Sequence, residues 1–429
     1  MKRAHIISVG NELLIGDTVN TNASWIGRFL TEQGFSIDEV ITISDNYTAI
    51  RRTIEWSLSH ADLVISTGGL GPTHDDVTKK AVADLFNSEM VLDEQVLDHI
   101  KKMFRRRGFE FSRSNKDQAM VPDACEVLFN KSGTAPGLWF EKNGSCLAVL
   151  PGVPYEMQYL MEEKVAEKIR SVFPQTRFRK VSYLKTAGVT ESSLSDDIIG
   201  DLGRYLTNGI EVAYLPGPGG VTLRLSVQGE SPESSVNRLK ELEDHIMKKA
   251  GDYVFGKGRD LTIAEALGSE LRKRSLSISI AESCTGGHLS NDITDIPGCS
   301  DYFKGSVVAY SNDVKINRLG VPASVIENHG AVSRETALAM ADGVARSLIS
   351  DIGISTTGIA GPGGGTDQKP VGTVWMGFRI LDQHFALKAL LTKNRNINKQ
   401  RSSMIALETV RRTLLKVDEM PYGIKKETA

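Results

Sequence analysis

Short apolar runs alternate with stretches of helical periodicity from residue 4 to about residue 170. The runs AHIISVG, DEVITIS and ADLVIST have the length and β-branched content of buried strands. Patterns typical of amphipathic helices follow them at 21–33, 47–59 and 76–86. This alternation predicts βαβ crossovers and a mainly parallel sheet with helices on both faces, whose ligands collect at the carboxyl ends of the strands.

The pattern changes between about residue 175 and residue 256. RKVSYLKTAG reads as a strand, ESSLSDDIIGDL as a helix, IEVAYLPGPGGVTLRLSVQG as a hairpin and PESSVNRLKELEDHIMKKAG as a charged amphipathic helix. The order βαββα predicts a small α+β unit. The GPGG at 217–220 matches the G-x-x-G of RNA-binding KH domains in form, but it stands between two strands, so we predict a hairpin turn.

A second α/β pattern begins near residue 260, after the linker FGKGRD. Helical patterns at its start, near 286–294 and around 313–349 alternate with the strand-like runs SLSISIAES, GSVVAYS, IGISTTG and GTVWMGFRI. The predicted fold class is therefore α/β, with two α/β domains of mainly parallel sheets joined by a small α+β domain. We place the domains at 1–172, 173–257 and 258–429.

Composition narrows the classes of function. With a net charge of −2 and basic residues spread along 429 residues, the chain has no electrostatic footprint for direct nucleic-acid binding. The basic run KKMFRRRGF at 101–109 is interpreted as the solvated face of a helix. No apolar run is long enough for a membrane span or a signal peptide, and the four cysteines lie far apart. We expect a cytoplasmic protein with free thiols.

Ser283 follows the strand SLSISIAE directly and precedes CTGG, whose glycines allow a sharp turn into a helix. A serine held there faces unpaired backbone N–H groups that can stabilise the oxyanion of acyl transfer. The alternative is that Ser283 or Thr285 only caps the helix. Cys284 is the stronger nucleophile in chemical terms, but a thiolate needs a histidine or another cation beside it, and the contexts of His288, His329 and His384 do not indicate that role, which favours a small buried residue.

A serine nucleophile needs a base, and the next predicted strand offers one. In GSVVAYSNDVK, Tyr310 ends the strand and Lys315 follows about one helical turn later. Ser–Lys pairs are a known variant of the nucleophile–base arrangement, provided that desolvation or a dipole lowers the pKa of the lysine. Tyr310 is a candidate to hold or relay the lysine's proton. The alternatives are an exposed helix lysine and a half-buried strand tyrosine.

Two further regions carry glycine-rich loops. STTGIAGPGGGTDQKPVGTVW at 355–375 lies between two predicted strands, and its backbone N–H groups could surround a phosphate or complete an oxyanion site. In the N-terminal section, SVGNELLIGDTVNTN, STGGLGPTHDDVTKKAV and AVLPGVPYEMQYLM bring glycines and carboxylates to one sheet edge. Phosphate contacts and a hard divalent cation are expected there. The cation ligands would be Glu12, Asp17, Asp75, Asp76 and Glu156, although Asp75 and Asp76 also suit the first turn of a helix.

AESCTGG, GSVVAYSNDVK, HGAVS and GIAGPGGGT…KPVGTVW resemble, in order and spacing, the C-terminal domain of the competence/damage-inducible CinA family, which is similar to nicotinamide mononucleotide deamidase. The resemblance implies hydrolysis of the nicotinamide carboxamide to nicotinic acid mononucleotide and ammonia, without a cofactor. Ser283 then corresponds to the nucleophile, Lys315 to the general base and Tyr310 to its partner. The residues expected to face the substrate are Thr285, Gly286, Gly287, Gly358, Gly361, Gly363, Gly364, Gly365 and Thr366.

The N-terminal motifs resemble the same family, whose N-terminal domain is similar to the molybdopterin-binding fold. The resemblance implies a metal-dependent ADP-ribose pyrophosphatase that yields AMP and ribose 5-phosphate, and a homodimer with the middle unit as a spacer. The residues expected to bind the nucleotide are Gly68, Gly69, Gly71, Thr73 and Asn20.

Two alternatives remain open from the sequence. One is a scaffold in competence or DNA-damage response that binds a pterin or nucleotide without turnover, since a fold does not decide a function. The other is a serine amidase that acts on a carboxamide unrelated to pyridine nucleotides.

Overall fold

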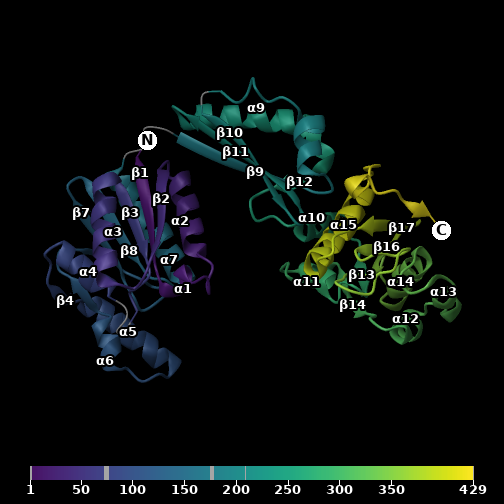
Figure 1. Ribbon diagram of the computed structural model, residues 1–429, viewed down its shortest axis with the longest axis horizontal. Coiled ribbons are helices and arrows are strands. Elements are labelled where there is room, and N and C mark those ends of the chain that lie inside the picture. The colour runs from purple at the N-terminus through teal and green to yellow at the C-terminus, as the bar shows by residue number, and fades with distance from the viewer. Residues whose placement is uncertain (1, 72–76, 174–177, 208, 429) are drawn as a thin grey trace. The chain divides into compact units, whose positions relative to one another are not determined.

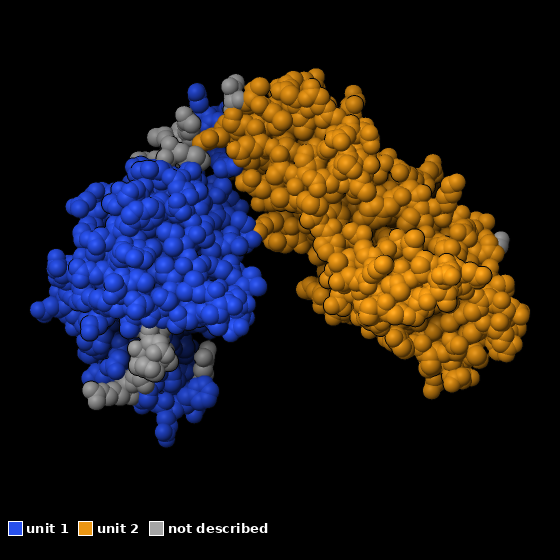
Figure 2. Space-filling view, viewed as in Figure 1, with its two compact units in different colours: residues 1–179, 229–235 blue, residues 180–228, 236–429 orange. Residues whose placement is uncertain are grey.

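The computed structural model describes residues 2–71, 77–173, 178–207 and 209–428 (Figure 1). The chain divides into two compact units, coloured separately in Figure 2. Unit 1 comprises Met1–Arg179 and Gly229–Ser235, and unit 2 comprises Lys180–Gln228 and Val236–Ala429. The middle and C-terminal parts of the chain thus lie mostly in the same unit.

Unit 1 is built on a six-stranded sheet of order β2-β1-β3-β8-β7-β6, in which β2, β1, β3 and β8 run parallel. Alternate residues of β1 enter different cores: Ala4 and Ile6 pack on one face of the sheet, Ile7 and Val9 on the other. The strands are β1 (Arg3–Val9), β2 (Ser36–Ile43), β3 (Leu63–Thr67), β6 (Glu126–Leu128), β7 (Gly137–Lys142) and β8 (Ser145–Leu150).

Helices cover both faces of this sheet, as Figure 1 shows. They are α2 (Thr21–Glu32) with α7 (Pro154–Leu160), η1 (Met161–Val165) and α8 (Ala166–Val172) on one face, and α3 (Tyr47–His60) with α4 (Thr78–Leu85) on the other. The short helix α1 (Asn11–Leu14) follows β1. A smaller group consists of β4 (Met90–Leu92), α5 (Glu94–Arg107), α6 (Arg113–Asp117) and β5 (Met120–Pro122). Lys101, Lys102, Arg105 and Arg106 of α5 are exposed, which confirms the solvated basic helix face.

The middle part of the chain forms a four-stranded sheet of order β10-β11-β9-β12. Its elements are β9 (Phe178–Thr186), the π-helix η2 (Ser193–Ile199), β10 (Ile210–Gly217), β11 (Gly220–Gly229), α9 (Pro232–Ala250), η3 (Gly251–Tyr253) and β12 (Val254–Lys257). Gly217 pairs with Gly220 across the antiparallel strands β10 and β11, so the predicted hairpin turn at GPGG is confirmed.

The C-terminal sheet has the order β14-β13-β15-β16-β17-β18, with β14, β13 and β15 parallel and the rest antiparallel. The strands are β13 (Ile278–Glu282), β14 (Phe303–Val308), β15 (Ile352–Gly358), β16 (Thr373–Ile380), β17 (Gln383–Leu390) and β18 (Glu427–Thr428). The α/β class predicted from the hydrophobic pattern is confirmed in both sheets.

Helices again lie on both faces of the C-terminal sheet. One face packs on α10 (Ile263–Arg274), α11 (His288–Thr294) and α15 (Arg395–Leu415), the other on α12 (Asn312–Leu319) and α14 (Arg334–Ser347). The remaining elements are η4 (Cys299–Asp301), α13 (Ala323–His329) and η5 (Pro421–Gly423). The four cysteines are free thiols. Within the described residues, no helix combines the length and the apolar character that a membrane crossing requires.

Candidate active site

Ser283 occupies the turn that joins β13 to α11. The strand ends at Glu282, and the helix begins at His288, after Gly286 and Gly287. Both glycines have positive φ angles, 61° and 96°, a conformation that other residues rarely adopt. The Ser283 amide donates to the Thr356 carbonyl at 2.9 Å, which fixes the turn to the neighbouring strand β15. Ser283 thus stands at the carboxyl edge of the parallel strands, and it is 9% exposed.

Glu282, the last residue of β13, holds the same turn through hydrogen bonds to the start of α11. Its carboxylate is fully buried and accepts hydrogen bonds from the amides of Gly287 (2.8 Å), Leu289 (3.2 Å) and Ser290 (2.8 Å). A carboxylate at the N-terminus of a helix satisfies orphan N–H groups and interacts favourably with the helix dipole. Sequence reasoning missed this residue, although a glutamate that ends the apolar run SISIA is a visible signal.

Lys315 reaches Ser283 from α12, as the sequence predicted. Its side chain is buried, and Nζ lies 3.1 Å from Ser283 Oγ, 2.8 Å from the Ala309 carbonyl and 3.3 Å from the Tyr310 carbonyl. No carboxylate of the described residues pairs with it. Burial lowers the pKa of Lys315 below its usual value, because the ammonium form loses its hydration.

The three oxygen contacts of Lys315 Nζ accommodate both the charged and the neutral amine. A neutral amine has two N–H donors and one lone pair, whereas an ammonium group has three donors and no acceptor. As an ammonium group Lys315 donates to all three oxygens, Ser283 Oγ included; as a neutral amine it can donate to the two carbonyls and accept the proton of Ser283 Oγ with its lone pair. The lysine side chain is therefore placed to act as a general base toward Ser283.

Two backbone amides beside Ser283 are available for an oxyanion. The amides of Gly286 and Gly287 are occupied by the Ser283 carbonyl and the Glu282 carboxylate. Those of Cys284 and Thr285 donate to no other residue that the structure describes, although the Cys284 amide lies close to its own thiol. Burial raises the pKa of the Cys284 thiol to about 12, so this side chain stays protonated and does not compete as a nucleophile.

The side chains of two predicted site residues, Tyr310 and Thr285, make their contacts away from Lys315. Tyr310 is 64% exposed, and its hydroxyl accepts a hydrogen bond from Arg395 Nη2 at 3.1 Å, so only its main-chain carbonyl meets Lys315. Tyr310 comes two residues after the end of β14, so the sheet does not fix the direction of its side chain, which points to solvent. The Thr285 side chain points inward, fully buried, with its hydroxyl 2.6 Å from the Thr356 hydroxyl. Only the Thr285 backbone can face a substrate.

The glycine-rich loop divides into a packed beginning and an exposed middle. Gly358 belongs to β15, where a side chain would lie 2.7 Å from the Thr373 carbonyl, so this glycine serves strand packing. Gly361 is buried, and its carbonyl accepts from Arg395 Nη1 at 2.9 Å. The residues that remain exposed, as expected of a substrate loop, are Gly363, Gly364, Gly365 and Thr366.

The start of α15 supplies cations that sequence reasoning missed. Arg395 joins the glycine loop to Tyr310 through its two hydrogen bonds. Lys399, one helical turn later, brings Nζ to 3.9 Å from where a side chain of Gly286 would begin. Two cations beside exposed glycines are suited to an anion such as a phosphate. The signal was the basic run KNRNINKQR at 393–401.

In unit 1, a cavity of about 470 Å³ opens at the carboxyl ends of β1, β3 and β8. Five predicted residues do meet there: Glu12, Gly68, Gly69, Gly71 and Glu156. Asp45, Gln118, Thr134 and Gly152 also line it and were not foreseen. Gly68 and Gly69 have positive φ, and side chains there would lie 2.1 Å from the Val9 carbonyl and 2.0 Å from Thr78 Oγ1. Only glycine fits these positions.

Other predicted residues of unit 1 lie elsewhere. Asn20 caps α2 through Ala23 and contacts Ser8 and Thr42, so its side chain is already engaged. Asp17 lies in the exposed turn between α1 and α2 and does not line the cavity. Glu156, by contrast, does line the cavity; it is buried, and its carboxylate accepts a hydrogen bond from Asn130 Nδ2 at 2.7 Å. Thr73, Asp75 and Asp76 lie outside the described residues. Among those described, no three His, Cys, Asp or Glu residues form a group that could hold a metal.

Comparison with known protein families gives three matches along the chain, one for each of its N-terminal, middle and C-terminal parts. Residues 260–414 match the model of the CinA C-terminal domain, residues 5–171 that of a probable molybdopterin binding domain, and residues 182–256 that of the damage-inducible protein CinA KH domain. The middle domain is thus KH-like, a kinship that the sequence analysis considered from GPGG and set aside, while GPGG itself is the predicted strand–strand hairpin.

Relatives match at nearly full length. A CinA-like protein of Chloroherpeton thalassium is 44% identical over 96% of this chain and 99% of its own, and one of Salinibacter ruber is 41% identical over the same shares. The crystal structure of a competence/damage inducible protein from Agrobacterium tumefaciens is 34% identical and covers 36% of this chain and 93% of its own, with a TM-score of 0.35. On the full-length similarity, this chain belongs to the CinA family of competence/damage-inducible proteins.

Proposed function

We propose that the C-terminal domain is an amidohydrolase that converts nicotinamide mononucleotide to nicotinic acid mononucleotide and ammonia. The observation that carries the proposal is the 3.1 Å contact between Ser283 Oγ and the buried Lys315 Nζ. A buried lysine whose pKa is lowered by desolvation, next to a serine at a strand–helix turn, is the arrangement of a Ser–Lys acyl-transfer site.

The reaction divides into two steps in this account. Ser283 Oγ attacks the carboxamide carbon while Lys315 Nζ takes its proton, and the amides of Cys284 and Thr285 donate to the developing oxyanion. Lys315 then gives the proton to the leaving nitrogen, ammonia departs, and a nicotinoyl ester of Ser283 remains. Lys315 next takes a proton from water, the water oxygen attacks the ester carbon, and Ser283 leaves with that proton as the acid is released.

The choice of a mononucleotide rests on the surroundings of Ser283. Arg395, Lys399 and the exposed glycine loop support binding of the ribose phosphate, while Ser283 meets the carboxamide. The same residues would add little to the binding of a simple neutral amide. The family resemblance favours the same substrate.

A panel of amides tests this specificity. Ammonia release would be measured with nicotinamide mononucleotide, nicotinamide, benzamide and glutamine at equal concentrations. The proposal expects kcat/KM for the mononucleotide to exceed that for free nicotinamide by at least about 100-fold, since phosphate contacts contribute a few kcal/mol. Turnover of the simple amides without the mononucleotide would leave a serine amidase of another specificity.

For the N-terminal domain we propose, as a second activity, cleavage of the ADP-ribose pyrophosphate with a divalent cation. The cavity in which Gly68 and Gly69 bring backbone close to Val9 and Thr78, beside Glu12 and Asp45, supports a phosphate-bearing ligand. The described carboxylates do not by themselves form a metal site, so Asp75 and Asp76 would have to complete it, and we derive no step through the metal.

Chelation separates this activity from the deamidase. We expect a metal chelator to stop release of AMP from ADP-ribose while ammonia release by the C-terminal domain continues. If the domain instead binds ADP-ribose or a pterin with or without chelator and never releases AMP, it is a binding scaffold, the alternative function of this domain. Loss of both activities on chelation would mean that the metal serves another purpose.

A further inference from the structure

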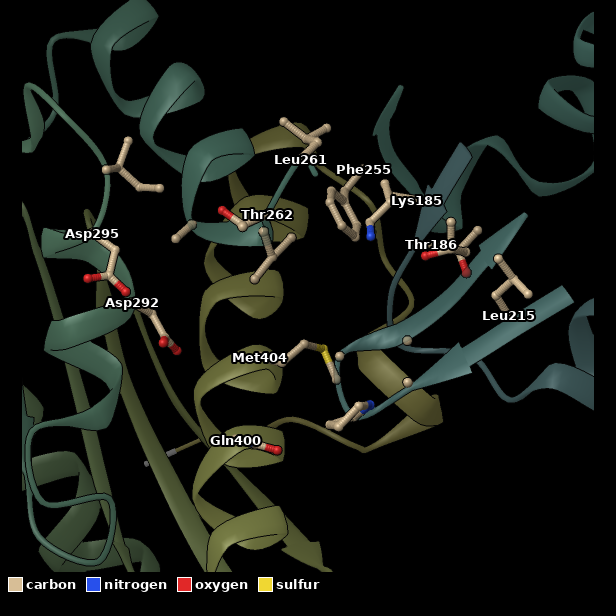
Figure 3. A pocket seen from close by; sticks show the side chains of 18 of the residues that line it. Lys185, Thr186, Leu215, Phe255, Leu261, Thr262, Asp292, Asp295, Gln400 and Met404 are labelled. Atoms are coloured by element: carbon tan, nitrogen blue, oxygen red, sulfur yellow. The ribbon is translucent and has the colours of Figure 1, made fainter. Parts of the chain in front are cut away.

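Unit 2 also contains a cavity, of about 510 Å³, which lies between the KH-like and C-terminal domains. Figure 3 shows its walls: β9 and the β10–β11 hairpin on one side, α11 on the other, with α10 above and α15 below. Its volume is in the range of small-molecule sites. The hairpin turn Gly217–Gly220 therefore faces a cavity and α15, where a side chain at Gly219 would meet Met404.

One wall of this cavity carries a lysine whose charged group has few hydrogen-bonding partners in the protein. Lys185 of β9 makes one long hydrogen bond, 3.3 Å to the Arg259 carbonyl, and no ion pair within the described residues. Desolvation lowers its pKa, while the nearby Asp260 carboxylate acts in the opposite direction. In Figure 3 the Lys185 side chain lies beside the Phe255 ring. An anionic group of a ligand would replace the lost hydration of this ammonium group.

The opposite wall is acidic. Asp292 of α11 and Asp295, which caps the end of that helix, line the cavity together with His288. Asp292 accepts a hydrogen bond from Ser403 Oγ, and its second oxygen lies 3.9 Å from His288 Nε2. Burial raises the pKa of Asp292, while the Ser403 bond and the His288 charge act against the rise. A positively charged ring would restore the preference of Asp292 for its ionised form.

Apolar side chains separate the two charged walls. Phe255, Leu261, Ile263, Ile296 and Met404 line the space between Lys185 and the aspartates. An aromatic ring packs well against phenylalanine and methionine side chains. The cavity thus matches a ligand with an anionic group, an aromatic ring and a positive charge.

We propose that this cavity is a second binding site for a pyridine mononucleotide, with its phosphate at Lys185 and its pyridinium ring toward Asp292 and Asp295. The proposal rests on the proposed function in its choice of this substrate class. A ligand there would touch α11, whose first turn is held by Glu282 next to Ser283. Occupancy would therefore change the rate at the Ser283 site, and the coupling would be reciprocal.

Binding stoichiometry tests the second site. Nicotinamide mononucleotide would be titrated calorimetrically into the full chain carrying Ser283→Ala, and into the same chain with Lys185→Met, Asp292→Asn or Lys249→Met added. Lys249 is an exposed lysine of α9 and serves as the matched control. We expect Lys185→Met and Asp292→Asn each to remove one equivalent of binding, or to weaken it at least 10-fold, with no change for Lys249→Met.

The outcomes separate this proposal from the proposed function. Equal stoichiometry and affinity in all four proteins would overturn the second site, whatever the deamidase does. If the wild type releases no ammonia but the Lys185-dependent equivalent persists, the second site stands and the deamidase falls. Initial rates of the wild type should deviate from a hyperbola as the second site fills, and a purely hyperbolic dependence over the range in which it fills would overturn the coupling.

Discussion

Lys315 is the residue on which the proposed chemistry depends. Lys315 is buried with two carbonyls and a serine as its partners, and no carboxylate of the described part of the chain stabilises its charge, so burial shifts it toward the neutral form. The same burial that makes the lysine a base makes it costly for the fold. Both consequences can be measured on this single side chain.

Replacing Lys315 by methionine should lower kcat for ammonia release by about 10²–10⁴-fold, the usual contribution of a general base. Affinity for the mononucleotide, measured by calorimetry, should change only a few-fold, because Lys315 faces Ser283 and the backbone. Lys304→Met, on an exposed lysine of β14, is the control. A variant of Lys315 with unchanged kcat would show that another group takes the Ser283 proton.

The pKa of Lys315 also predicts a pH dependence of stability. Its folded pKa is lowered, so between that value and about 10.4 the unfolded chain holds a proton that the folded chain does not. In that window the free energy of unfolding rises with pH by about 1.4 kcal/mol per unit from this group; below the folded pKa both states are protonated and the contribution is flat.

Urea unfolding of the wild type and Lys315→Met across this window measures the effect. The wild type should gain stability relative to the methionine variant as pH rises, until the unfolded lysine also loses its proton. Parallel curves for the two proteins would contradict a lowered pKa.

At the scale of elements, the turn between β13 and α11 is the critical connection. Glu282→Gln keeps the shape of the side chain but removes the charge from three helix-end hydrogen bonds. We expect a loss of about 1–3 kcal/mol in the free energy of unfolding, and a fall in kcat because the Ser283 turn loosens. Glu233→Gln, in the exposed first turn of α9, should do neither. An unchanged kcat would mean that Glu282 only stabilises the fold.

The beginning of α15 is the second important element. Arg395→Met removes a guanidinium that contacts the glycine loop and Tyr310. In the Ser283→Ala background the dissociation constant of nicotinamide mononucleotide should rise about 10-fold or more, since a charged hydrogen bond contributes about 1.5–3 kcal/mol. Arg318→Met, on the exposed side of α12, is the control. Equal affinities would exclude Arg395 from phosphate binding.

The sequence predicted these elements better than their side-chain contacts. Hydrophobic periodicity and the glycines after Ser283 indicated a strand–turn–helix, and the spacing from Tyr310 to Lys315 placed the lysine on the next helix. The direction of Tyr310 depends on how its strand ends against α15, about 85 residues later in the chain. Glu282 and Arg395 act through contacts that only the folded sheet brings together, so motif spacing could not reveal them.

At the scale of the whole molecule, the KH-like and C-terminal domains share one compact unit. Arg412 of α15 connects them: fully buried, it donates to the Ala187 carbonyl just after β9, to the Glu419 carbonyl and to the Glu408 carboxylate. The predicted picture of three separate domains did not include this connection, because a buried arginine is not visible in the hydrophobic pattern.

Arg412→Met should lower the stability of unit 2 by about 3–5 kcal/mol, because buried carbonyls and part of a carboxylate lose their donor. Arg411→Met is the matched comparison, since Arg411 is also buried and donates to Glu408 but, among the described residues, makes no hydrogen bond to the KH-like domain. Calorimetric unfolding should show the larger shift for Arg412. Equal shifts would mean that the domains are held together by other contacts.

The central claim is that Ser283, with Lys315 as its base, hydrolyses the carboxamide of nicotinamide mononucleotide. The most direct test is ammonia release from this compound by the purified wild type, Ser283→Ala and Cys284→Ala, measured side by side. We predict rapid release by the wild type, release within a few-fold of it by Cys284→Ala, and none above background by Ser283→Ala. Release that survives in Ser283→Ala, or that is absent from the wild type, would contradict the account.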